Sequence, residues 1–104
     1  MKTRNRRTGY SANTAKEYID NKQAIHCLST ELEPQMRFED GQPTGEIIAH
    51  KAWFSQKRLP PFQVKFDSEI DLPSYMAMVE FDTLEACEVG FNVYFRAQNL
   101  KEVK

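Results

Sequence analysis

The sequence is poor in the residues that mark low-complexity, disulfide-stabilised and membrane-spanning chains. Its 104 residues include four Gly, five Pro and two Cys. The distant Cys27 and Cys87 do not amount to a disulfide framework, so we expect two reduced thiols. Apolar runs are far shorter than the ~20 residues that span a bilayer. The cationic N-terminus lacks the apolar segment of a secretory signal. These absences favour a cytoplasmic protein with no membrane contact.

No catalytic or metal-binding signature stands out either. The two His and two Cys show neither C-x-x-C nor H-x-x-x-H spacing, which disfavours a metal site. A nucleophilic Cys–His pair would need a flanking motif, and none is present. Four acidic residues crowd one corner, where a solvated surface is commoner than a Mg²⁺ site: Glu80, Asp82, Glu85 and Glu88. We therefore expect a protein that is not an enzyme and takes no cofactor.

Charge is segregated along the chain, although the formal net charge is only −1. Residues 1–26 carry six cations against two acids, and the remainder carries eight against thirteen. Residues 1–13 lack apolar periodicity and include Arg4, Arg6 and Arg7, which predicts a flexible basic arm. Such an arm either binds phosphates or only aids solubility. Both alternatives remain open.

Residues 14–104 have the length of one domain with one small core. Thr14-x-x-Glu17 fits a capping box and predicts a short helix there, although 24–28 also reads as a first strand. Residues 82–90 look like a one-turn helical corner. Short strands are expected in five ranges, with Gly or Pro turns between several of them: 35–39, 45–54, 62–66, 75–81 and 91–96.

Four or five short strands with one helix predict a mainly β fold, specifically a small antiparallel five-stranded barrel of the oligonucleotide/oligosaccharide-binding type. A closed barrel is attractive because it leaves no exposed strand edge. A barrel this small often dimerises to extend a binding surface, so a homodimer is also considered.

The stretch from Gly45 to Phe66 contains the first candidate binding residues. Side chains alternate along a strand, so Lys51 and Trp53 share one face, and Lys65 points away from the apolar face of its own strand. Lys57 and Arg58 lie in the connector between the two strands. Cations beside a large ring suit a phosphate backbone and its bases. A core Trp beside solvated lysines is the simpler alternative for each residue.

A second set lies on the last clear strand, where Asn92, Tyr94 and Arg96 face outward. Tyr94 would stack on a base, while Arg96 would contact a phosphate or a base plane. Alternatively, Tyr94 only covers a neighbouring strand. The two sets form one patch if their strands are neighbours in the sheet. The acidic stretches 67–71 and 80–88 should then lie on the opposite side, since they would repel phosphates.

Three runs, GQPTGEIIAHKAWF…PPFQVKF, YMAMVEF and FNVYFRAQNLKEV, resemble small single-stranded-DNA-binding proteins of phages and plasmids. They are also similar to helicase-accessory proteins of conjugative elements. The resemblance covers about residues 36–103 and is diffuse. It implies DNA contact by five residues of this chain: Lys51, Trp53, Lys65, Tyr94 and Arg96.

The sequence therefore predicts a non-sequence-specific single-stranded-DNA-binding protein that supports replication or transfer of a mobile genetic element. A helicase, a relaxase or another replication protein is the expected protein partner. The alternative is a small adaptor or inhibitor that acts through its acidic surface. DNA and RNA are not distinguished by these patterns.

Overall fold

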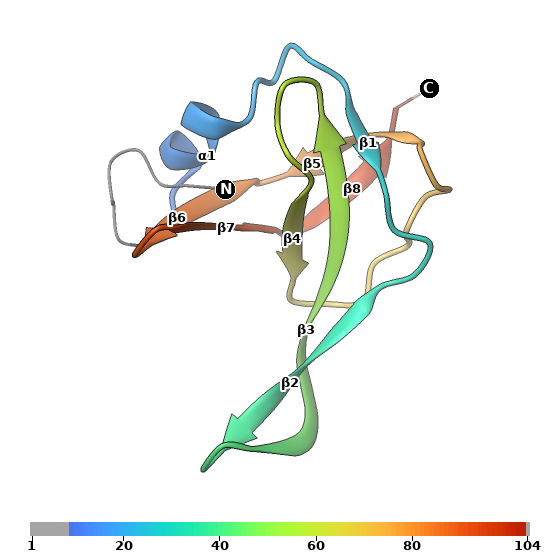
Figure 1. Ribbon diagram of the computed structural model, residues 1–104. Coiled ribbons are helices and arrows are strands. Elements are labelled where there is room, and N and C mark those ends of the chain that lie inside the picture. The colour runs from blue at the N-terminus through green and yellow to red at the C-terminus, as the bar shows by residue number, and fades with distance from the viewer. Residues whose placement is uncertain (1–8, 104) are drawn as a thin grey trace.

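The computed structural model describes residues 9–103, and Figure 1 shows a mainly β chain with one short helix. The helix is α1 (Ala12–Tyr18). The strands, in chain order, are β1 (Ile25–Cys27), β2 (Glu33–Glu39), β3 (Gln42–Gln56), β4 (Phe62–Phe66), β5 (Met78–Asp82), β6 (Glu85–Val89), β7 (Asn92–Ala97) and β8 (Asn99–Glu102). The mainly β prediction is confirmed.

All eight strands belong to one open sheet of mixed direction, in the order β6-β7-β4-β3-β1-β5-β8, with β2 added on β3. The β4–β7 pair is parallel, and the other pairs are antiparallel. The predicted closed barrel of five antiparallel strands is therefore wrong. Within residues 9–103, β8 pairs only with β5, and no ladder joins it to β6 at the other end of the sheet.

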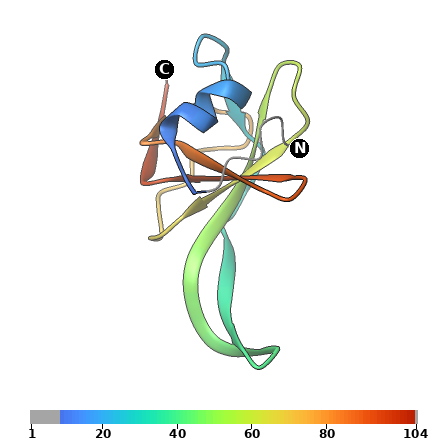
Figure 2. The same cartoon turned by 90° about the vertical axis from the view of Figure 1, so that its left-hand side faces the viewer.

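The helix covers the edge of β6 where a barrel would need another strand. Ser11 caps α1 by accepting a hydrogen bond from the Thr14 amide at 3.1 Å. Ser11 also exchanges two backbone hydrogen bonds of 3.0 Å with Ala86. The helix thus begins at Ala12, not Thr14, and residues 9–13 belong to the folded part instead of a free arm. Figure 2 shows α1 lying beside the sheet.

A buried polar contact fastens the helix to the sheet. The Tyr18 hydroxyl of α1 donates a hydrogen bond to the Glu88 carboxylate of β6, and both side chains are buried. A buried carboxylate is costly unless it is hydrogen-bonded, so this contact offsets part of the cost of burying Glu88.

The predicted helical corner at 82–90 is also wrong, because residues 85–89 form β6.

Alternation along the central strands places one face in the core. Ala52, Phe54, Val64 and Phe66 are fully buried, and Phe95 nearly so. The rings pack on one another, with the Phe54 and Phe81 centroids 4.8 Å apart at 80° and the Phe62 and Phe95 centroids 5.3 Å apart. The intervening residues of β3, β4 and β7 consequently point to the opposite face of the sheet.

The outer part of β3 pairs with β2 as a hairpin that extends away from the rest of the molecule (Figures 1 and 2). Its turn has positive φ at Asp40 (50°) and Gly41 (78°), the conformation in which an Asp-Gly pair is favoured. Met36 lies opposite Ile47 and Phe38 opposite Pro43, and Phe38 is 64% exposed. Arg37 forms ion pairs with Glu39 and Glu46.

The described chain has no helix that is both long and apolar enough to cross a membrane.

Candidate functional site

Three of the predicted cations form a row across adjacent strands. Lys51 of β3 is opposite Lys65 of β4, and Lys65 is opposite Arg96 of β7. Directly opposed residues point to the same face of a sheet, about 5 Å apart between strands. The structure therefore brings together residues from segments that are far apart in sequence. Parallel pairing of β4 with β7 is what places Arg96 in this row.

Two aromatic side chains accompany the row on the same face. Trp53 is two residues from Lys51, and Tyr94 is two residues from Arg96. Trp53 is 39% exposed and Tyr94 47%, whereas their neighbours Phe54 and Phe95 are buried. Both rings are thus surface side chains and not core residues. We call Lys51, Trp53, Lys65, Tyr94 and Arg96 the platform.

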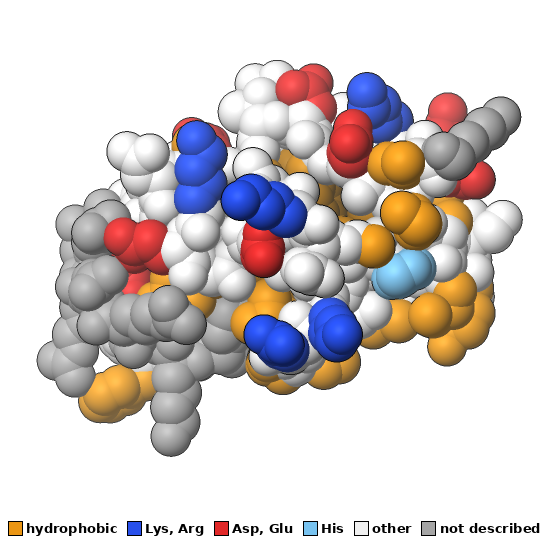
Figure 3. All heavy atoms as spheres, turned by 90° about the horizontal axis from the view of Figure 1, so that it is seen from above, with side chains coloured by type: hydrophobic (Ala, Val, Ile, Leu, Met, Phe, Trp, Pro, Cys, Tyr) orange, Lys and Arg blue, Asp and Glu red, His pale blue; other side chains and the backbone are white. Residues whose placement is uncertain are grey.

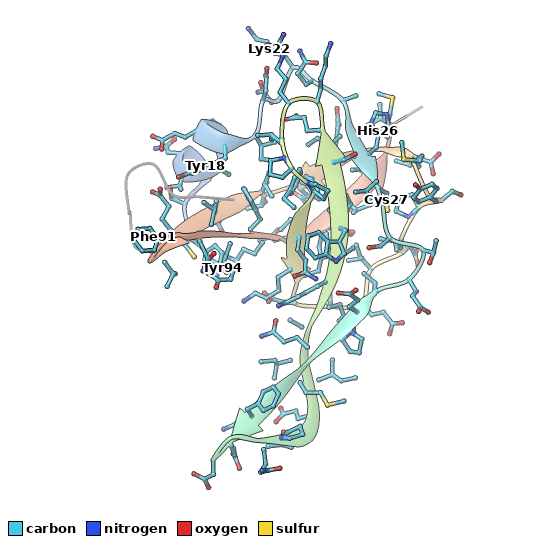
Figure 4. The ribbon with its side chains drawn as sticks, viewed as in Figure 1. Tyr18, Lys22, His26, Cys27, Phe91 and Tyr94 are labelled. Atoms are coloured by element: carbon cyan, nitrogen blue, oxygen red, sulfur yellow. The ribbon has the colours of Figure 1, made fainter. Side chains whose placement is uncertain are left out.

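Four of the five platform residues, all except Arg96, line a hollow of about 420 Å³. Figure 4 shows Tyr94 pointing away from β7, beside the central strands. Gln63 lies between the two rings, opposite Trp53, and its Nε2 donates to Glu33 Oε2 at 2.9 Å. The hollow is lined by Tyr10, Gln35, Lys51, Trp53, Pro61, Phe62, Gln63, Lys65, Asn92, Val93, Tyr94 and Phe95.

Carboxylates flank the cation row at both ends. Glu33 of β2 is opposite Lys51, and Glu85 of β6 is opposite Arg96. Arg96 Nε donates to Glu85 Oε1 at 2.9 Å. The expectation that residues 80–88 lie wholly on the far side is therefore wrong for Glu85. Within the described chain, no carboxylate lies within ion-pair distance of Lys51 or Lys65.

Tyr10 belongs to this site, although the sequence placed it in the basic arm. Its ring lies under two platform cations, with the centroid 4.1 Å from Arg96 Cζ and 5.5 Å from Lys65 Nζ. Burial and the neighbouring Cys87 raise the pKa of the Tyr10 phenol to about 12, against a smaller opposing effect of Arg96. No local pattern identifies Tyr10, because the bridge between Ser11 and Ala86 determines its position.

The other predicted cations are not part of the platform. Lys57 and Arg58 are exposed in the turn after β3, and Lys57 is four residues beyond Trp53, or about 13 Å along an extended strand. Figure 3 looks onto this end and shows Lys and Arg side chains spread among acidic and uncharged ones. Arg4, Arg6 and Arg7 lie outside the described residues, but they precede Tyr10 closely in sequence.

A larger hollow of about 750 Å³ lies between α1 and β5. Ile19, Val79 and Phe81 contribute apolar surface, and Lys16 and Lys22 also line it. None of the predicted site residues that the structure describes borders it. Among residues 9–103, His, Cys, Asp and Glu form no group of three or more able to hold a metal ion.

Comparison of the chain with protein-family models, curated proteins and solved structures gave no match.

Proposed function

We propose that this protein binds single-stranded DNA without sequence specificity, using the platform as its contact surface. One observation carries the proposal. Lys51, Lys65 and Arg96 form a row beside two exposed rings, Trp53 and Tyr94. A single strand offers a charged backbone and flat bases, which cations and rings can bind without reading the sequence.

The two types of platform residue have separate tasks. Ammonium groups at Lys51 and Lys65 attract phosphates and release their counterions, which makes affinity depend on salt. Stacking on Trp53 and Tyr94 contributes about 1–3 kcal/mol per base, because every base has a π-face. Arg4, Arg6 and Arg7, which lie outside the described residues, would add further phosphate contacts.

The wider context of the proposal is replication or transfer of a mobile genetic element, with a helicase or relaxase as partner. The resemblance of residues 36–103 to phage, plasmid and conjugative-element proteins suggests this context.

Fluorescence anisotropy with labelled oligo-dT at low and raised salt tests the proposal, with Trp53 emission followed in parallel. Trp53 is the only tryptophan, so its emission reports directly on the platform. Binding that weakens with salt and quenches Trp53 is the expected result. Tyr94→Ala should weaken binding, whereas Tyr75→Ala should not, because Tyr75 is also exposed but lies outside the hollow. Absence of binding at low salt would overturn the proposal.

The alternative of an adaptor acting through its acidic surface finds less support among the described residues. The predicted acidic corner is largely engaged within the chain. Glu80 pairs with Lys101, Glu85 pairs with Arg96, and Glu88 is buried against Tyr18. Glu85 and Glu88 are therefore less available to a basic partner protein, whereas Glu80 and Asp82 remain exposed.

A further inference from the structure

Arg96 differs from the two platform lysines because its guanidinium is held on two sides. Its Nε donates to Glu85 Oε1 at 2.9 Å, and its Cζ lies 4.1 Å from the Tyr10 ring centroid. A guanidinium carbon this close to a centroid lies over the ring, in the range of a cation–π contact. The side chain is nevertheless 42% exposed. The guanidinium of Arg96 is thus held in a fixed orientation, while part of the side chain remains exposed to solvent.

The Glu85 carboxylate makes Arg96 a poor phosphate ligand. A phosphate approaching this guanidinium would meet a negative charge already bonded to Nε, and like charges repel. Lys51 and Lys65 have no such competitor within ion-pair distance in the described chain. The lysines are therefore better placed to neutralise a phosphate.

Tyr10 is held in place independently of any ligand. The next residue, Ser11, is fixed to Ala86 by two backbone hydrogen bonds, and the Tyr10 phenol contacts Cys87 of the same strand. The Tyr10 ring occupies one side of the guanidinium, with its centroid 4.1 Å from Arg96 Cζ, so a base would have to approach from another side of this partly exposed group. An Arg plane presented in this way can stack on a base.

From this geometry we infer that Arg96 contacts DNA as a third flat surface for a nucleobase and not as a phosphate ligand. Tyr10 and Glu85 are positioning residues that fix its plane. The inference rests on the proposed function. Tyr94 and Arg96 are about 7 Å apart along β7, and Trp53 lies two strands away at about 10 Å. Trp53, Tyr94 and Arg96 would thus bind bases from one short segment of single-stranded DNA.

The test compares Arg96→Ala, Arg96→Lys and Lys51→Ala by anisotropy over a series of salt concentrations. The probes are oligo-dT and an abasic oligonucleotide of the same length. Both Arg96 variants should lose affinity for oligo-dT by roughly tenfold, since Lys keeps the charge but not the plane. Their salt slopes should equal the wild-type slope, and their affinities for the abasic strand should be unchanged.

Lys51→Ala serves as the matched control because it removes a phosphate contact. It should reduce the salt slope by about 0.7 and weaken binding to both oligonucleotides. Tyr10→Leu should behave like Arg96→Ala, and Tyr10→Phe should lose less affinity than Tyr10→Leu because the ring remains. Glu85→Gln should increase the salt slope, since the released guanidinium becomes free to bind a phosphate.

Two results would overturn the inference while leaving the proposed function intact. One is wild-type affinity in Arg96→Lys together with a slope reduced by about 0.7 in Arg96→Ala, as a phosphate ligand requires. The other is wild-type affinity in Arg96→Ala itself. If the wild-type protein binds neither oligonucleotide at low salt, the proposed function fails and the inference fails with it.

Discussion

At the scale of single residues, adjacent aromatic side chains on one strand serve either the core or the platform, according to whether they are buried or exposed. Tyr94 and Phe95 are neighbours on β7, yet the first is 47% exposed beside the hollow and the second is 3% exposed in the core. Trp53 and Phe54 on β3 show the same division. A sequence search for aromatic residues cannot separate these tasks, whereas strand alternation can once the buried face is known.

This division predicts opposite effects for two neighbouring substitutions. Phe95→Ala should lower the free energy of unfolding by about 3–5 kcal/mol, because it leaves a cavity in the core. Tyr94→Ala should cost about 1 kcal/mol or less, as is usual for surface positions, while it weakens DNA binding. Urea denaturation of both variants measures the difference. A loss of several kcal/mol in Tyr94→Ala would show that Tyr94 is a core residue.

The raised pKa of Tyr10 gives a second prediction at this scale. Burial and Cys87 favour the neutral phenol in the folded state and raise its pKa from 10.0 to about 12. The contribution of Tyr10 to the free energy of unfolding is complete below pH 10. It is lost as the pH rises from 10 towards 12, because the phenol ionises in the unfolded chain before it ionises in the folded one. Lys65, Arg96, Cys87 and Tyr94 surround the phenol.

Stability should therefore fall between pH 10 and 12 in the wild type, and part of this fall should be absent in Tyr10→Phe. Denaturation at several alkaline pH values, with tyrosinate absorbance followed in parallel, measures both effects. Identical pH profiles in the two proteins would argue against a perturbed Tyr10.

At the scale of elements, the β2–β3 hairpin depends mainly on its own turn. Its outer part extends away from the rest of the molecule, as Figures 1 and 2 show. A two-stranded hairpin is marginally stable alone. The stability of this hairpin therefore depends strongly on residues that tolerate the positive φ values at Asp40 and Gly41. The Asp-Gly pair is a turn signal visible in the sequence.

Gly41→Val should loosen the hairpin without unfolding the sheet. A side chain at φ 78° costs about 1–2 kcal/mol, although nothing lies within 4 Å of the position of a Cβ. Amide exchange should accelerate for Arg37 and Phe38 while Val64 stays protected. Asp40→Asn is the control, since Asn-Gly favours the same turn. Equal acceleration in β4 would show that the hairpin unfolds together with the core.

At the scale of the whole molecule, the open sheet is completed by a helix instead of another strand. Ser11 covers the edge of β6, and Tyr18 ties α1 to Glu88 of that strand. The same segment carries Tyr10 to the platform. The N-terminal region therefore links the stability of the fold to the geometry of the site.

Tyr18→Phe should lower the free energy of unfolding by about 1–3 kcal/mol, because it removes a hydrogen bond from a buried carboxylate. Thermal unfolding measures the effect, with the exposed Tyr75→Phe as the control. Oligonucleotide affinity below the unfolding transition should be unchanged, since Tyr18 does not border the hollow. A Tyr18→Phe protein as stable as the wild type would argue against this tie between helix and sheet.

The sequence by itself determined the mainly β class, the range of β4, the position of β7 to within one residue at each end, and the alternation that turns Lys51 and Trp53 to one face. These features depend on local conformational preferences and on the period of two along a strand. It missed β6 as a strand and placed Tyr10 in the arm. β6 pairs with β7 across the short turn at Gly90 and Phe91, so a local hairpin signal was present there and was read as a helical corner. Tyr10 has no such local signal, because its position depends on the bridge between Ser11 and the distant Ala86.

Only the tertiary structure decided the open sheet, the neighbourhood of β4 and β7, and the contact of Arg96 with Tyr10 and Glu85. Parallel pairing of β4 with β7 joins residues about 30 positions apart, and the Ser11–Ala86 bridge joins residues 75 apart. Alternation shows which side chains share a face within one strand, but not which strands are neighbours. That choice follows from burying the aromatic core and pairing the backbone of all eight strands together.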